Sequence, residues 1–186
     1  MQMSIRISAT ELPGILLIEP RVFEDPRGFF LETHHQRKYS EAGLDAQFVQ
    51  DNHSHSKRDT LRGLHYQLAH PQGKLIYAAC GEIFDVAVDL RRSSSAFGKW
   101  YGARLSSENH LQIYIPPGFA HGFCVLSDRA DVVYKCTDFY YADDDLGILW
   151  SDPDIGIRWP ISEPIISEKD KALPALSQLS ADKLPA

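Results

Sequence analysis

The chain has 186 residues, a length that favours one domain spanning residues 1–186. Its hydrophobic content of 44% is enough for a sizeable core, and its net charge of -6 argues against a nucleic-acid-binding protein. The three cysteines are widely spaced and form no CxxC, which argues against a disulfide framework or a zinc ribbon. No apolar run has signal-peptide or membrane-spanning length, so we expect a cytoplasmic protein without a membrane segment.

Short strand-like segments separated by turn signals follow one another, which predicts an all-β sandwich or barrel. The expected strands cover residues 15–23, 29–33, 48–56 (strand or loop), 61–67, 74–80, 83–90, 100–105, 110–115, 122–126 and 131–137. Residues 36–42 form the best helix candidate, which Gly43 would end. The segment beyond Pro164 has little periodicity and is expected to be a covering arm.

Two features of this pattern concern burial and edges. Residues 83–90 alternate between apolar and polar positions, with Asp85 and Asp89 in the polar phase, which predicts a half-buried strand. Many strands and few helices also leave sheet edges that closure, sandwiching or a second subunit would cover. The N-terminal strand is a candidate for exchange between subunits.

Histidines give the first indication of chemistry. His53 and His55 form an HxH, and His65 and His121 lie on other expected strands. Alternate residues of a strand share a face, so the HxH is compatible with a metal site. It is equally compatible with the polar edge of a strand.

A pair of motifs resembles the cupin superfamily. Residues 116–121 have the form PxGxxH, like the second cupin motif, in which a turn delivers a histidine into the barrel. The first cupin motif reads HxH, then Glu, then six residues and Gly. Here His65 begins that frame and Gly81 ends it, but Gln67 replaces the second histidine and Lys74 replaces the glutamate.

These two replacements change the expected chemistry. The loss of an imidazole and a carboxylate removes the usual hold on a divalent cation, so we expect no metal. A buried Lys74 ammonium could stabilise a developing oxyanion instead. With His65 as base, the site would suit proton abstraction beside a carbonyl. The alternative for Lys74 is a solvated lysine after a turn.

The chain also resembles a more specific family, the dTDP-4-dehydrorhamnose 3,5-epimerases, from about Gly14 to Leu176. The resemblance rests on motifs that occur together and in order: Asp25-Pro26-Arg27-Gly28 with Glu32, Gln50-Asp51-Asn52, Leu61-Arg62-Gly63-Leu64-His65-Tyr66-Gln67, Ile115-Pro116-Pro117-Gly118-Phe119-Ala120-His121-Gly122-Phe123, Tyr134-Lys135, Trp150, Asp152-Pro153, Gly156-Ile157, Trp159-Pro160 and Ser167-Glu168-Lys169-Asp170.

That resemblance implies epimerisation at C3 and C5 of dTDP-4-dehydro-6-deoxy-D-glucose, giving dTDP-4-dehydro-L-rhamnose. It also implies a cupin-like jelly-roll β-barrel with short helices and terminal arms, a homodimer, and no metal or organic cofactor. The expected partner is the dTDP-4-keto-6-deoxy sugar.

The resemblance further assigns the catalytic roles. His65 would be the base, and Asp170 would orient and charge its ring. Tyr134 would be the acid on the opposite face of the sugar, and Lys74 would stabilise the enolate. From the residues alone, Tyr134 could equally be a core tyrosine, and nothing places Asp170 near His65.

The implied substrate contacts form a larger group. Arg62 precedes His65 by three residues, near the barrel mouth if His65 faces inward, and arginine suits diphosphate oxygens. Asp145 stands where the family often has a glutamate, and Tyr141 leaves the thymine-stacking residue, expected to be Tyr140, slightly ambiguous. The full set comprises Arg27, Glu32, Gln50, Asp51, Asn52, Arg62, His121, Tyr140, Asp145 and Lys169.

Three other functions remain compatible with the sequence. A sister enzyme could epimerise only C3 or only C5 of a 4-keto nucleotide sugar. A metal-dependent cupin could use His53, His55, His65 and His121, although Gln67 and Lys74 argue against it. A non-catalytic sugar-binding barrel would need no base at His65 at all.

Overall fold

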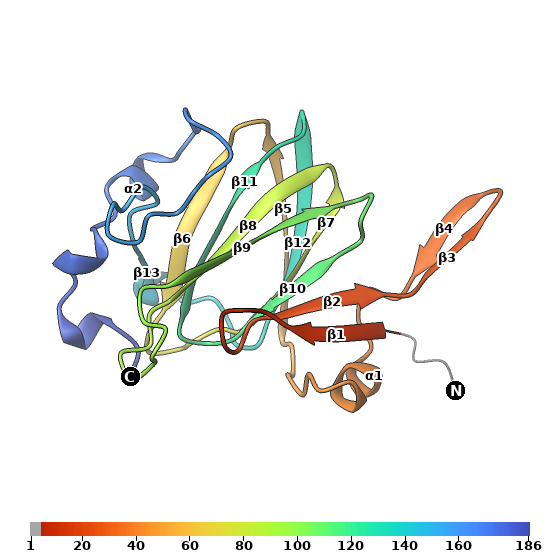
Figure 1. The fold of residues 1–186 in the computed structure, drawn as a ribbon, viewed down its shortest axis with the longest axis horizontal. Coiled ribbons are helices and arrows are strands. Elements are labelled where there is room, and N and C mark those ends of the chain that lie inside the picture. The colour runs from red at the N-terminus through yellow and green to blue at the C-terminus, as the bar shows by residue number, and fades with distance from the viewer. Residues whose placement is uncertain (1–4) are drawn as a thin grey trace.

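The computed structural model describes residues 5–186, so residues 1–4 of the expected domain lie outside the described residues. Two antiparallel sheets pack face to face (Figure 1). The six-stranded sheet has the order β1 (Ile5–Ala9), β2 (Leu16–Pro20), β10 (Gln112–Ile115), β7 (Lys74–Cys80), β12 (Arg129–Cys136) and β5 (Gln50–Lys57). The five-stranded sheet has the order β13 (Asp145–Gly147), β6 (Leu61–Gln67), β11 (Phe119–Val125), β8 (Glu82–Asp89) and β9 (Trp100–Ser106).

The remaining elements are short. A two-stranded hairpin of β3 (Val22–Asp25) and β4 (Gly28–Leu31) projects away from the barrel (Figure 1). The helices are α1 (Gln36–Glu41), α2 (Glu168–Lys171) and three 3₁₀ turns at Ala142–Asp144, Leu176–Gln178 and Ala181–Lys183. No helix in residues 5–186 combines the length and apolar character needed to cross a membrane.

The all-β prediction is confirmed, with differences at particular elements. Strands 61–67 and 74–80 and the helix from Gln36 are confirmed, and Gly43 follows the helix with a φ of 105°. The single strand expected over 15–23 is wrong, because β2 ends at Pro20, which has no N–H to continue a ladder. The sequence analysis did not predict β1, β13 or α2.

Three apolar clusters hold the layers together. The space between the sheets contains Ile76, Ile113, Phe123 and Val132. The outer face of the six-stranded sheet packs Ile18 and Leu75 against Tyr39 of α1 and the segment around Leu44. The outer face of the five-stranded sheet packs Leu64, Tyr66, Val86 and Val88 under Ile155, Leu176, Leu179 and Leu184. The expected C-terminal covering arm is therefore confirmed.

That arm changes the interpretation of β8. Val86 and Val88 face the arm, whereas Asp85, Ala87 and Asp89 face the barrel interior and are fully buried. The prediction of a half-buried strand is wrong because both faces are covered. Polar residues at alternate positions of a strand usually face solvent. Here two of them, Asp85 and Asp89, are buried carboxylates.

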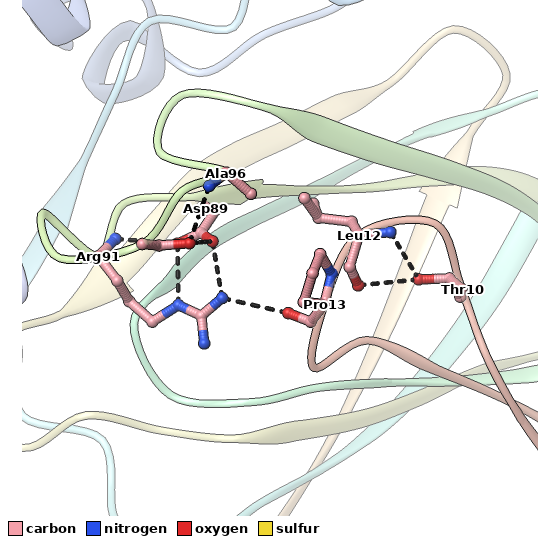
Figure 2. Close-up of polar contacts among 7 residues, drawn as sticks. Thr10, Leu12, Pro13, Asp89, Arg91 and Ala96 are labelled. Carbon is pink, nitrogen blue, oxygen red and sulfur yellow. Dashed lines mark hydrogen bonds and ion pairs between the residues drawn. The ribbon is translucent and has the colours of Figure 1, made fainter.

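The buried Asp89 carboxylate ties two loops together (Figure 2). It accepts hydrogen bonds from the Arg91 side chain at 2.6 Å and from the Ser94 hydroxyl at 2.7 Å, and Arg91 in turn donates to the Pro13 carbonyl at 3.1 Å. Burial acts to raise the pKa of Asp89, but these hydrogen bonds outweigh it and hold the pKa below its ordinary value. The β1–β2 turn is thereby fastened to the end of β8.

Candidate active site

Polar side chains from both sheets face the barrel interior. On β11, His121 lies between Phe119 and Phe123, which both belong to the interior cluster. On β12, Tyr134 follows the interior residue Val132 and packs against the same cluster. Because alternate strand residues share a face, these registers aim the polar side chains into the barrel. The inward polar residues include His65, Asp85 and His121 of the five-stranded sheet and Asn52, Ser54, Ser56, Lys74 and Tyr134 of the six-stranded sheet.

A β-bulge in β6 brings Arg62 to the same side as His65. Three residues apart on a regular strand, these two side chains would face opposite ways. The pairing of β6 with β11 shifts between His121, which lies opposite His65, and Phe123, which lies opposite Arg62. The extra residue restores a common face, which is the usual effect of a bulge.

Glycine is required at the bulge. Gly63 has a φ of 109°, and a Cβ there would lie 2.6 Å from the His121 carbonyl oxygen and 2.7 Å from the Gly122 Cα. Both neighbours are backbone atoms of β11, so neither can rotate away. The Gly63–Leu64 peptide bond is cis.

Asp170 joins the bulge to His65. One carboxylate oxygen of Asp170 lies 2.7 Å from His65 Nε2, and the other accepts a hydrogen bond from the Gly63 N–H at 3.1 Å. The backbone N–H of Asp170 is held by the Ser167 hydroxyl at the start of α2, at 3.1 Å. The structure therefore brings together two residues that the sequence alone could not place in contact.

The environment of Asp170 keeps it ionised. Burial acts to raise its pKa, but hydrogen bonds from His65, Gly63 and Ser167, together with the His65 charge, hold the pKa below its ordinary value. An ionised Asp170 fixes the proton of neutral His65 on Nε2 and leaves Nδ1 as the basic atom. Nδ1 has no hydrogen-bond partner among residues 5–186.

A second histidine–aspartate pair lies beside the first. His121 Nε2 is 2.8 Å from one oxygen of Asp85, and His121 is the cross-strand neighbour of His65. Asp85 is fully buried, and its other oxygen has no partner in the described part of the chain. Sequence analysis missed Asp85 as a site residue. The available signal was a carboxylate within an apolar strand, which becomes meaningful only when the outer face is known to be covered.

The six-stranded sheet supplies the opposite wall. Lys74 lies directly across from Cys136, and Tyr134 lies across from Ile76. Burial lowers the pKa of Lys74, while the nearby acidic groups of Cys136, Asp145 and Asp85 act in the opposite direction. Burial raises the pKa of Tyr134, which keeps its phenol protonated. Lys74 is half-buried and shares its strand face with the interior residue Ile76, so it faces the barrel interior rather than open solvent.

Around this interior, several of the expected substrate-binding residues contact one another. Asp145 accepts a hydrogen bond from the Tyr140 hydroxyl at 2.9 Å and pairs with Lys169. Gln50 accepts from the Tyr140 backbone N–H at 2.9 Å and donates to Asn52 at 3.1 Å. These contacts place Tyr140, Asp145, Lys169, Gln50 and Asn52 in one group.

Gln67 stands where the cupin frame has a metal ligand, but its side chain hydrogen-bonds to backbone groups. Its amide donates to the carbonyls of His70 and Phe139 at 2.7 and 3.0 Å, and its oxygen accepts from the Tyr141 N–H at 2.8 Å. It therefore fixes the loop that carries Tyr140.

Three of the expected substrate-binding residues, Arg27, Glu32 and Asp51, do not contact this group within one chain. Arg27, in the turn of the projecting hairpin, pairs with Asp25, and Glu32 pairs with Lys38. The side chain of Asp51 pairs with Lys135 at 2.9 Å on the outward-facing side of β5. Within one chain, Arg27, Glu32 and Asp51 therefore lie apart from the other expected substrate-binding residues.

The HxH motif lies on that same outward side of β5. His53 and His55 approach one oxygen of Asp131 at 2.9 and 3.0 Å, and both are exposed. Nowhere in residues 5–186 do three or more His, Cys, Asp or Glu side chains form a group that could hold a metal ion. Of the two interpretations of the HxH, the polar strand edge fits the structure.

Two open hollows, of about 530 and 690 Å³, lie elsewhere. They surround α1 and its following loop, and they are lined by residues such as Leu16, Gly43, Tyr114 and His34. None of the inward polar residues lines either hollow. We take the barrel interior as the candidate active site because two histidine–aspartate pairs, a lysine and a tyrosine face it.

Comparison with known proteins gives consistent results. Residues 9–178 match the family model described as dTDP-4-dehydrorhamnose 3,5-epimerase. A protein of that name from Shigella flexneri is 55% identical over 168 residues, which cover 89% of this chain and 93% of the relative. One from Pseudomonas aeruginosa is 56% identical over 162 residues, covering 86% and 90%.

A solved structure is similar over nearly the whole chain. The dTDP-6-deoxy-D-glucose-3,5-epimerase of Legionella pneumophila Philadelphia 1, in complex with dTDP-4-keto-L-rhamnose, superposes with a TM-score of 0.94. It is 46% identical and covers 97% of each chain. This similarity confirms the cupin-like jelly-roll fold.

We predict that Gly63→Ala strongly destabilises the protein. The added Cβ meets backbone on β11 and also imposes an unfavourable φ, so we expect a loss of about 3 kcal/mol or more in the free energy of unfolding. Gly28→Ala is the matched control, because Gly28 has a φ of 125° but nothing within 4 Å of an added Cβ. Urea denaturation should show a clearly smaller loss for Gly28→Ala, and equal losses would contradict the requirement for close approach.

Proposed function

The chain belongs to the dTDP-4-dehydrorhamnose 3,5-epimerase family, and we propose that it epimerises dTDP-4-dehydro-6-deoxy-D-glucose at C3 and C5 to give dTDP-4-dehydro-L-rhamnose. It is an isomerase of dTDP-L-rhamnose biosynthesis. The observation that carries the proposal is the convergence of the His65–Asp170 pair with Lys74 and Tyr134 from the facing sheet. This arrangement supports proton removal from one side of a bound sugar and proton return from the other.

The substrate's carbonyl explains why one base can serve two centres. C3 and C5 both flank the C4 ketone, so removal of either proton gives an enolate that the same carbonyl oxygen stabilises. We assign the base to Nδ1 of His65, with the ionised Asp170 holding the ring and stabilising the imidazolium that forms. Inversion then requires a proton from the opposite face.

Tyr134 is assigned as that proton donor. It belongs to the sheet opposite His65, and burial raises its pKa, so it is protonated at neutral pH. Lys74, from the same sheet, is assigned to the enolate oxygen, where an ammonium stabilises developing negative charge. His121, positioned by Asp85, is assigned to a sugar oxygen.

The nucleotide is assigned to the group at the edge of the interior. Arg62 is exposed on the same side as His65 and offers a planar fork to the diphosphate. The half-exposed ring of Tyr140 is available for stacking on thymine. Lys169, Asp145, Gln50 and Asn52 complete the contacts.

We propose that the active form is a homodimer in which the β3–β4 hairpin of one subunit completes the site of the other. Phe23, Phe29 and Phe30 on this projecting hairpin are 46%, 58% and 67% exposed, which is typical of a surface that a partner covers. The edge strand β5, which carries Gln50 and Asn52, pairs with only one neighbour among the described residues. A partner's hairpin would bring Arg27 and Glu32 to the nucleotide.

A cytoplasmic location is part of the same proposal. All three cysteines are free, with Cys124 and Cys136 buried and Cys80 half-buried. Unpaired thiols are the usual condition in a reducing compartment.

His65→Asn and Tyr134→Phe should each reduce turnover by about 10²–10⁴-fold, the usual contribution of a positioned general base or acid. Turnover of dTDP-4-dehydro-6-deoxy-D-glucose can be followed by chromatography of the product. His53→Asn is the matched control, because His53 lies on the outward side of β5 and should leave turnover unchanged. An effect below tenfold at His65 or Tyr134 would count against the assignment.

The pH dependence should identify the lysine. Burial lowers the pKa of Lys74 from its ordinary 10.5, so the ammonium is lost as pH rises through a midpoint below 10.5. Burial raises the pKa of Tyr134 above its ordinary 10.0, which is the opposite direction to the shift of Lys74. We expect kcat/KM to fall at alkaline pH with the midpoint of Lys74 deprotonation. Arginine keeps its charge at all accessible pH. The Lys74→Arg variant should be less active, and its kcat/KM should fall only at a higher pH than that of wild type. An unmoved midpoint would exclude Lys74 as the titrating group.

Subunit complementation tests the shared site. Arg27→Ala should lower kcat/KM by at least about tenfold, because a charged hydrogen bond to phosphate is lost. When His65→Asn and Arg27→Ala proteins are unfolded and refolded together, half of the dimers are mixed, and one of their two sites has both residues intact. Activity should rise to roughly a quarter of wild type. No increase above the separately refolded proteins would show that Arg27 does not act across subunits.

A further inference from the structure

The inward side of β5 is a row of four polar residues, Gln50, Asn52, Ser54 and Ser56, and the Ser54 hydroxyl has no partner among residues 5–186. Asn52 receives a hydrogen bond from Gln50 and approaches the Cys136 sulfur at 3.5 Å. The Ser56 hydroxyl accepts a hydrogen bond from Arg62 Nε at 3.0 Å. The Ser54 hydroxyl between them is buried and has no hydrogen-bond partner among residues 5–186. A buried hydroxyl normally has a partner, so this one points to a ligand.

The position of Ser54 relates it to two parts of the proposed site. Asn52 lies across the ladder from Tyr134, and Ser54 lies one step further along, opposite Val132. Ser56, the next inward residue, holds Arg62. Since inward residues of a strand repeat roughly every 7 Å, Ser54 lies between the assigned proton donor and the assigned diphosphate-binding arginine.

A nucleotide sugar bound across these two residues has a particular group at this point. With the hexose beside Tyr134 and the diphosphate beside Arg62, the phosphate attached to the sugar lies between them. Its oxygens are charged acceptors, and the Arg62 fork can satisfy only some of them. Ser54 offers a donor that nothing in the described chain uses.

We propose that the Ser54 hydroxyl donates a hydrogen bond to the β-phosphate of the nucleotide sugar and so fixes the hexose relative to Arg62. The inference rests on the proposed function, because it needs the hexose at Tyr134. Ser54 is then a substrate-binding residue of this site, and Ser56 is a positioning residue for Arg62.

The test compares two nucleotides by calorimetry at one salt concentration. dTDP and dTMP share the base, the deoxyribose and the α-phosphate, and only dTDP has the β-phosphate. Ser54→Ala should weaken dTDP binding about five- to tenfold and leave dTMP binding unchanged. Its Tm without ligand should equal or exceed that of wild type, because the variant removes a hydroxyl that has no partner in the protein.

Each other outcome has a definite meaning. Unchanged dTDP binding, or an equal loss for both nucleotides, would overturn the β-phosphate contact. A lower Tm with losses for both nucleotides would show a structural role and would also overturn it. Wild-type turnover and dTDP binding are measured in parallel: if both are absent, the proposed function itself fails, whereas if both are present, the Ser54 result stands alone.

Discussion

The carboxylate of Asp170 is the interaction on which the site depends. One of its oxygens contacts His65 and the other accepts the Gly63 N–H, so the same group orients the His65 ring and holds the bulge that aligns Arg62 with it. Asp170 comes from the C-terminal arm, whose apolar side chains cover the five-stranded sheet. Packing of the arm on the outside of the barrel therefore determines the geometry inside it.

The two-sheet architecture suits a reaction that needs opposite faces. A strand directs alternate residues to one side, so each sheet contributes one wall of inward polar groups. A polar interior is costly unless its groups are paired, and most are. Asp85 is paired with His121, Asp170 with His65, and Ser56 with Arg62. Among the described inward groups, the Ser54 hydroxyl and one Asp85 oxygen are buried without a protein partner.

The sequence predicted local strands better than it predicted contacts between residues that are distant along the chain. Strands such as 61–67 and 74–80 were predictable because turn signals follow them in the sequence. The cupin frame predicted that the Lys74 side chain faces the barrel interior. The contact of Asp170 with His65 was not predictable, because it joins residues 105 positions apart. Asp85 was missed because an alternating pattern does not show whether its polar side faces solvent. Arg27 and Glu32 lie apart from the other expected site residues within one chain, and a strand pattern does not encode contacts between subunits.

The central claim is that a His65-centred barrel exchanges protons at both carbons beside the C4 ketone. Proton NMR of dTDP-4-dehydro-6-deoxy-D-glucose incubated with the enzyme in deuterium oxide tests this directly. We expect enzyme-dependent loss of both the C3 and the C5 proton signals, together with conversion to the L-rhamno product. Exchange at one carbon alone would contradict double epimerisation, and exchange at neither would contradict the catalytic role of the site.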